Sequence, residues 1–249
     1  TYVAQLYTQL ARTQSLQGKW DAAYAYLDKA KALLGKVDAV TEVRYLLELG
    51  RTYNSSGDKK KAYDLFTRAW ELAKDHQADG YAVDAAHMVA IAVESSQDTL
   101  TWNWKALAYA EQSSQPAAQK WKGSLYNNIG WTYFDNGDYQ TALDMFEKAL
   151  IEREQQGQAE NIRIGKWCIA RTQRELGQVE IALQTQLSLL DEHEAVNSED
   201  EYVFEELAYC YAALGDKSNA AKYAKLAYDI LSQQNNIPKP RLDALKAMM

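Results

Sequence analysis

Proline, cysteine and histidine are scarce in this sequence, and each scarcity excludes a class of protein. Only three prolines occur in 249 residues, so long helices can form with few interruptions. The two cysteines, Cys168 and Cys210, are too few for a disulfide framework and lack the spacing of metal ligands. Free thiols are typical of a reducing compartment, and we therefore expect a cytoplasmic protein.

The sequence also lacks a basic excess and a long apolar run. Its formal net charge is −7, which argues against binding to nucleic acid. No apolar stretch approaches the ~20 residues of a membrane span, so we expect no membrane contact. Residues 1–18 are amphipathic and have no apolar core of the kind that a signal peptide requires.

Catalytic and cofactor motifs are absent as well. There is no glycine-rich phosphate loop, nucleophile elbow or two-histidine metal motif. His193 lies near Asp191 and Glu194, but adjacent helical residues point about 100° apart and do not converge on a metal. We expect no enzymatic activity, no metal and no cofactor. The catalytic alternative would require an activity that depends on His87 or His193.

What the sequence does contain is a repeated frame around a turn glycine. Three copies at 46–69, 126–149 and 204–227 show it most clearly. Each copy has Tyr four residues before the glycine, Gly or Ala seven before it, and Ala five and twelve after it. Small residues on both sides of a turn allow two antiparallel helices to approach closely. The frame therefore predicts stacked helix pairs.

The turn glycines are Gly18, Gly57, Gly137, Gly177 and Gly215, at intervals of 39, 80, 40 and 38. The double interval predicts a degenerate copy at 84–112, in which Gln97–Asp98 takes the place of the turn. We expect an all-α chain that forms a single solenoid over residues 1–249. Its helix pairs are predicted at 4–38, 41–77, 81–115, 119–157, 160–195 and 200–234, and a capping segment at 237–249.

This frame resembles the tetratricopeptide repeat (TPR). The resemblance covers almost the whole chain, although Gln14 and Gln173 stand where the family has Tyr. A period near 40 is similar to the longer repeats of kinesin light chains and of bacterial peptide-sensing regulators. The resemblance implies a right-handed superhelix, an α-solenoid of about six repeats, whose first helices line a concave groove that holds peptides or partner proteins.

The groove face can be derived from the helical periodicity. At about 100° per residue, positions 13, 10, 9, 6, 3 and 2 before each turn glycine lie opposite the core positions. Five of the nine arginines fall on this sector and no lysine does: Arg12, Arg44, Arg51, Arg171 and Arg174. Because the guanidinium group suits carboxylates and aromatic rings, we interpret them as ligand-binding residues. The alternative is that they pair with Glu48, Glu175 or Asp135.

Four further residues of the sector are candidates for ligand contacts. Asn127 and Asn128 can donate and accept hydrogen bonds, so they can hold an extended peptide backbone, as groove asparagines do in the kinesin-light-chain-like repeats that this copy resembles. Trp131 and Trp167 can bury an apolar or aromatic side chain of the ligand. The alternative is that the asparagines are an inconsequential surface pair.

Charge on the sector varies along the chain. Arg12, Arg44 and Arg51 favour an acidic ligand segment near the N-terminal end. Glu205 and Glu206 have no cation on their own helix, so we expect the C-terminal end to favour basic segments. The carboxylate clamp that related repeats use for chaperone tails needs a lysine, which this sector lacks.

Together these patterns predict a non-enzymatic protein–protein interaction module that binds a peptide or partner segment in its groove. The alternative is a self-associating scaffold, or a regulatory segment of a larger protein, that acts through its end caps. Self-association would then depend on the C-terminal helix around Leu242 and Leu245.

Overall fold

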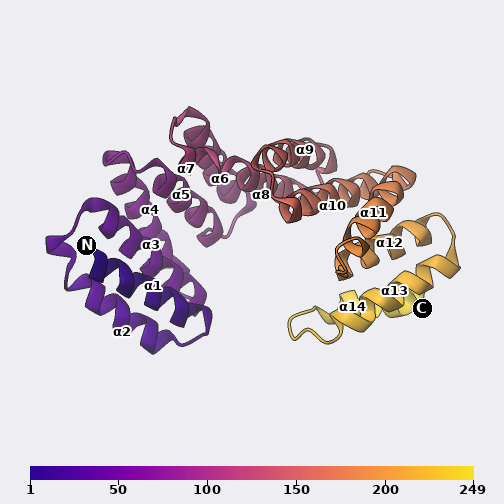
Figure 1. The fold of residues 1–249 in the computed structure, drawn as a ribbon, viewed down its shortest axis with the longest axis horizontal. Coiled ribbons are helices and arrows are strands. Elements are labelled where there is room, and N and C mark those ends of the chain that lie inside the picture. The colour runs from indigo at the N-terminus through magenta and orange to yellow at the C-terminus, as the bar shows by residue number, and fades with distance from the viewer. The chain divides into compact units, whose positions relative to one another are not determined.

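A computed structural model describes residues 1–249 of the chain, and it contains helices and no strands (Figure 1). A short 3-10 helix, η1, spans Leu34–Lys36. The α-helices are α1 Tyr2–Leu16, α2 Trp20–Lys31, α3 Ala39–Ser56, α4 Lys59–Asp75, α5 Asp79–Ala92, α6 Ser96–Gln112, α7 Pro116–Gln119, α8 Lys122–Asp135, α9 Tyr139–Gln156, α10 Ala159–Glu175, α11 Val179–Glu194, α12 Glu201–Ala213, α13 Lys217–Leu231 and α14 Lys239–Met248. None of them is long and apolar enough to cross a membrane.

The helices alternate along the chain as the repeated frame predicts. First helices α1, α3, α5, α8, α10 and α12 are each followed by a second helix: α2, α4, α6, α9, α11 and α13. The all-α helical repeat is therefore confirmed. The chain forms two compact units, residues 1–132 and 133–249, and the division lies within α8.

Glycine and aspartate define the turn inside the clearest helix pairs. Gly57, Gly137 and Gly215 have φ values of 100°, 81° and 79°, a left-handed conformation that favours glycine. The aspartate that follows each glycine caps the second helix. Asp58, Asp138 and Asp216 accept hydrogen bonds from the backbone N–H of Lys61, Thr141 and Asn219. A Gly–Asp pair thus ends one helix and starts the next.

The small residues of the frame lie where two helices make their closest contact. A Cβ atom on Gly50 of α3 would lie 2.5 Å from the Phe66 ring of α4, and Phe66 is fully buried. The alanines five residues after the turn, Ala62 and Ala142, are also fully buried. A larger residue at these positions would force the helices apart.

The degenerate third copy turns earlier than predicted. Gln97 and Asp98 lie inside the first turn of α6, and the loop occupies 93–95. The physical reason is a cap: the Ser95 hydroxyl accepts a hydrogen bond from the Asp98 N–H at 3.0 Å, so the helix begins directly after Ser95. The prediction that Gln97–Asp98 forms the turn was wrong.

The C-terminal segment forms a helix that covers the last repeat. Leu245 of α14 is fully buried in the core of the second unit, and Leu242 and Met248 pack against the same core. The Arg241 guanidinium also forms an ion pair with Glu205 of α12. The apolar residues of α14 are therefore engaged within the chain.

Candidate functional site

Three of the predicted arginines line one recess in the first unit, which we call the N-terminal recess. Arg12 comes from α1, and Arg44 and Arg51 come from α3. The recess has a volume of about 400 Å³. Its lining residues are Thr8, Gln9, Arg12, Thr13, Arg44, Leu47, Glu48, Arg51, Tyr81 and Asp84. The helical periodicity thus identified side chains that two first helices bring together.

Arg51 is held by two carboxylates. Its Nη1 donates to Glu48 Oε1 at 2.6 Å, and its Nη2 donates to both oxygens of Asp84 at 2.5 and 2.6 Å. Burial acts to lower the pKa of Arg51, but the charges of Asp84 and Glu48 outweigh it and hold that pKa above its usual value. Because Asp84 lies on α5, Arg51 links two consecutive first helices.

Arg44 and Arg12 are less constrained. Arg44 is half-buried, and its guanidinium makes no hydrogen bond or ion pair. Arg12 has a side chain that is 41% exposed, and its Nε lies 3.9 Å from Glu48 Oε2, too far for a hydrogen bond. Three arginines against the two carboxylates of Glu48 and Asp84 leave this recess with a positive charge. It can therefore accept an anionic group.

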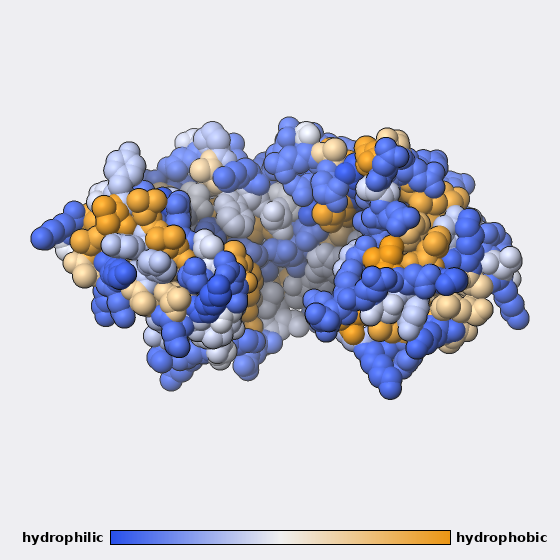
Figure 2. All heavy atoms as spheres, turned by 60° about the horizontal axis from the view of Figure 1, so that its bottom comes forward, coloured by the Kyte–Doolittle hydropathy of each residue, from blue (hydrophilic) through white to orange (hydrophobic).

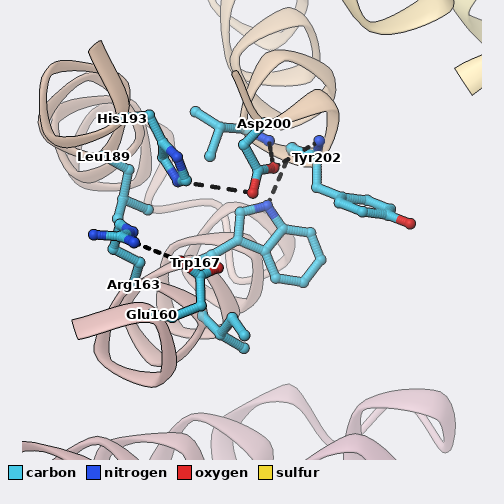
Figure 3. A pocket seen from close by; sticks show the side chains of 9 residues that line it. Glu160, Arg163, Trp167, Leu189, His193, Asp200 and Tyr202 are labelled. Carbon is cyan, nitrogen blue, oxygen red and sulfur yellow. Dashed lines mark hydrogen bonds and ion pairs between the residues drawn. The ribbon is translucent and has the colours of Figure 1, made fainter. Parts of the chain in front are cut away.

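A second recess lies in the second unit between α10, α11 and α12, and we call it the C-terminal recess (Figure 3). It has a volume of about 240 Å³. The residues that line it are Glu160, Arg163, Ile164, Trp167, Leu189, His193, Asp200, Tyr202 and Val203. A dry cavity of about 150 Å³ lined by apolar residues is large enough for a benzene ring. This recess can therefore hold one large apolar or aromatic side chain.

Trp167 is fixed in the C-terminal recess by its neighbours. Its Nε1 donates to the Tyr202 carbonyl oxygen at 3.1 Å, and the two rings meet edge to face at 6.1 Å. Leu189 and Val203 are buried beside them. Figure 3 shows polar side chains that interact with one another around this apolar centre. Among them, His193 Nε2 lies 3.7 Å from Asp200 Oδ2. An apolar ligand group would thus meet a preformed surface.

Arg171 and Arg174 are engaged by one buried glutamate. The Glu206 side chain has no exposed surface and accepts from Arg171 Nη1 at 3.1 Å and from Arg174 Nε at 2.8 Å. Burial acts to lower the pKa of Arg174, but the hydrogen bonds and charge of Glu206 hold that pKa above its usual value. These arginines join α10 to α12 as Arg51 joins α3 to α5.

The expectation of an open acidic end is therefore wrong. Glu205 and Glu206 are 1% and 0% exposed, and each has a cation from another helix. Glu205 pairs with Arg241, and Glu206 pairs with Arg171 and Arg174. In the sixth repeat, the positions nine and ten before the turn glycine face neighbouring helices and not solvent. Leu47 and Cys168 occupy these positions in other repeats and are also buried. Burial raises the pKa of the Cys168 thiol to about 12.

Asn127, Asn128 and Trp131 lie on α8, outside both recesses, and all three are half-buried. The Asn128 amide is directed at α5, where its Nδ2 lies 3.3 Å from His87 Nδ1. The His87 ring packs in turn on Trp121, with 5.5 Å between ring centroids. Asn128 thus has a partner inside the chain.

The sequence carried a signal for the ion pairs that the helical periodicity missed. Each arginine that bridges two first helices, and Arg241 of α14, lies 32–36 residues from its carboxylate: Arg12–Glu48, Arg51–Asp84, Arg171–Glu206, Arg174–Glu206 and Arg241–Glu205. This separation is slightly shorter than one repeat. A search for opposite charges at that separation would have found these contacts.

The tetratricopeptide repeat model matches residues 43–76 and 124–154. A comparison with curated protein sequences finds no match.

Solved structures with a similar fold share little sequence with this chain. A signal-transduction ATPase from Pyrococcus horikoshii with a tetratricopeptide repeat sensor has a TM-score of 0.74 at 16% identity, over 97% of this chain and 38% of its own length. TPR-like repeats of a kinesin light chain from Podospora anserina have a TM-score of 0.61 at 16% identity, over 79% of this chain and 98% of that chain. NprR in complex with its cognate peptide NprX has a TM-score of 0.57 at 18% identity, over 99% of this chain and 71% of that chain.

This chain spans well under half the length of the archaeal protein, and identities below 20% bear on the fold alone. The helix pairs, the Gly–Asp turns and the two sequence matches agree with one another. The chain carries tetratricopeptide repeats at residues 43–76 and 124–154, and its helical-repeat fold is that of the tetratricopeptide repeat proteins.

Proposed function

We propose that this chain is a non-enzymatic interaction module that binds a peptide or partner segment along its first helices. The observation that carries the proposal is the N-terminal recess, where Arg12, Arg44 and Arg51 converge and Arg44 has no partner. An unpaired guanidinium on a half-buried arginine is suited to bind a carboxylate. That NprR was solved with a peptide on a similar fold supports the same class of ligand.

The two recesses suit different ligand contacts, the N-terminal recess through charge and the C-terminal recess through apolar burial. Arg44 and Arg12 bind an acidic residue of the ligand in the N-terminal recess. Trp167 and its neighbours bury an apolar or aromatic residue in the C-terminal recess, and this contact supplies more of the binding energy.

The remaining predicted residues act around these recesses. Arg51, Arg171 and Arg174 hold the first helices in place, since carboxylates of this chain already occupy them. Asn127, Asn128 and Trp131 on α8 would contact ligand backbone and side chains beyond the recesses.

Replacing Arg44 with glutamate should weaken binding of acidic peptides about tenfold. The substitution removes the unpaired cation and places a like charge opposite the ligand. The measurement is fluorescence polarisation with short labelled peptides in which acidic residues and a single tryptophan are varied independently. Affinity for the acidic peptides should fall, whereas affinity for neutral tryptophan peptides should change little.

Lys60→Glu is the matched control. Lys60 is exposed on α4, the second helix of the same repeat, so the variant makes the same change in net charge outside the recess. The proposal predicts near-normal binding for Lys60→Glu. Equal losses in both variants would mean that only net charge matters, and unchanged binding in Arg44→Glu would remove the N-terminal recess from the proposal.

A further inference from the structure

The acidic excess of the chain lies entirely in its second unit. Residues 133–249 contain 20 acidic and 12 basic residues, whereas residues 1–132 contain 14 acidic and 15 basic residues. Figure 2 shows hydrophilic residues over much of the visible surface of the second unit, with apolar areas between them. Because the C-terminal recess belongs to this unit, a ligand that enters it approaches a negatively charged surface.

The residues that line the C-terminal recess offer no free cation to balance this charge. With histidine counted as neutral, the lining carries the charges of Glu160, Arg163 and Asp200. Arg163 forms an ion pair with Glu160 on the same helix. The Asp200 carboxylate accepts hydrogen bonds from the backbone N–H groups at the start of α12. The lining itself is therefore weakly acidic.

Two further carboxylates stand at the edge of the recess. Glu194 directly follows His193, and Glu199 directly precedes Asp200, and both of these neighbours line the recess. Consecutive Cα atoms are about 3.8 Å apart, so Glu194 and Glu199 begin beside the lining. Both are exposed, and neither side chain makes a hydrogen bond or ion pair. We call Glu194, Glu199 and Asp200 the acidic rim.

The segment that carries the acidic rim is held in a defined conformation. The Ser198 N–H donates to the His193 carbonyl oxygen at 3.0 Å, and the Ser198 hydroxyl lies 2.9 Å from His193 Nδ1. Asn197 has a φ of 53°, a left-handed conformation that asparagine tolerates. His193 and Asp200 lie together on one side of the recess (Figure 3). A preorganised rim loses less conformational entropy when a ligand binds.

We propose that the C-terminal recess binds an aromatic residue of the ligand that is flanked by lysine or arginine. The ring enters the recess against Trp167, and the flanking cations meet the acidic rim, because residues next to a buried one emerge at the edge of the recess. This inference rests on the proposed function and names the ligand sequence that this recess selects. The basic preference comes from the rim and not from Glu205 and Glu206, which arginines of the chain already neutralise.

The test compares tryptophan peptides whose flanking residues are either lysine or serine, each with a counterpart in which alanine replaces tryptophan. In fluorescence polarisation at low salt, the lysine flanks should raise the affinity of the tryptophan peptide about fivefold, the effect of two exposed ion pairs. The gain should be much smaller for the alanine counterpart, because without the aromatic anchor its lysines are not held at the rim. Added salt should reduce the gain.

Glu194→Lys combined with Glu199→Lys should abolish the gain from lysine. The difference between the tryptophan and alanine peptides with serine flanks should remain, since the recess itself is unchanged. The matched control is Glu147→Lys combined with Glu180→Lys, at two exposed carboxylates of α9 and α11 that do not line the recess. It makes the same change in net charge and should keep the preference for lysine.

Glu194→Gln combined with Glu199→Gln removes the charges without reversing them and guards against misfolding of the lysine variant. It should also lose the gain from lysine, with helicity unchanged in circular dichroism. Wild-type protein that gains nothing from lysine, or a control variant that loses the gain equally, would overturn the basic preference and leave the recess as an apolar anchor. Tryptophan peptides that bind no better than their alanine counterparts would contradict the proposed function of this recess as well.

Discussion

Replacing Glu206 with alanine should lower the free energy of unfolding by about 3–5 kcal/mol. Glu206 is fully buried and accepts hydrogen bonds from both Arg171 and Arg174. The side chains of these arginines are only 27% and 15% exposed. Removal of the Glu206 carboxylate leaves the two guanidinium groups partly desolvated and without a counter-charge. Urea denaturation followed by circular dichroism measures the change.

Asp229→Ala is the matched control, because it removes a carboxylate from an exposed pair. Lys225 and Asp229 form an ion pair on α13 with side chains 63% and 51% exposed, and such pairs contribute at most about 1 kcal/mol. The loss in free energy of unfolding for Glu206→Gln should lie between those for Glu206→Ala and Asp229→Ala, since glutamine retains a hydrogen-bond acceptor without the charge. A loss below about 1 kcal/mol for Glu206→Ala would contradict the role of this ion-pair cluster.

Replacing Ile164 with glutamate should weaken binding of tryptophan-containing peptides by about thirtyfold, which corresponds to about 2 kcal/mol. Ile164 lines the C-terminal recess and is 41% exposed, so the helix should tolerate the change. A carboxylate at this position must lose water when an apolar side chain enters. Fluorescence polarisation with matched tryptophan and alanine peptides measures the difference.

The control for this prediction is Ile181→Glu, because Ile181 is 51% exposed on α11 and lies outside the recess. Ile164→Glu should reduce the affinity of the tryptophan peptide to that of its alanine counterpart, whereas Ile181→Glu should preserve the difference between the two peptides. If the wild-type protein binds both peptides equally, the C-terminal recess is not an apolar anchor site. That result would leave the N-terminal recess unaffected.

The fold was predictable because local chemistry and repeat spacing agree. Gly57 and Gly137 end first helices in a left-handed conformation, and the following aspartates start the second helices. Gly50 needs to be small because Phe66 packs on it. The third copy was harder to place, since Ser95 supplies the helix start that a Gly–Asp turn supplies elsewhere.

The candidate site was predictable only in part, because helical periodicity places a side chain on a face and does not reveal its partner. It placed Arg12, Arg44 and Arg51 on one face, and all three line the N-terminal recess. It did not show that Arg51 is held by Asp84 of the next first helix. It also placed Glu206 on the exposed face, because it did not show the arginines of α10 that cover this residue. Whether such a residue is free depends on the neighbouring repeat, about 35 positions away.

The most direct test of ligand binding along the first helices is hydrogen–deuterium exchange of the intact chain, with and without the tightest-binding probe peptide. Backbone amides of α1, α3, α10 and α12, which border the two recesses, should exchange more slowly when the peptide is bound. Those of the second helices α2, α4 and α13 should be unchanged. Protection confined to α2, α4 and α13 would contradict the proposed binding face.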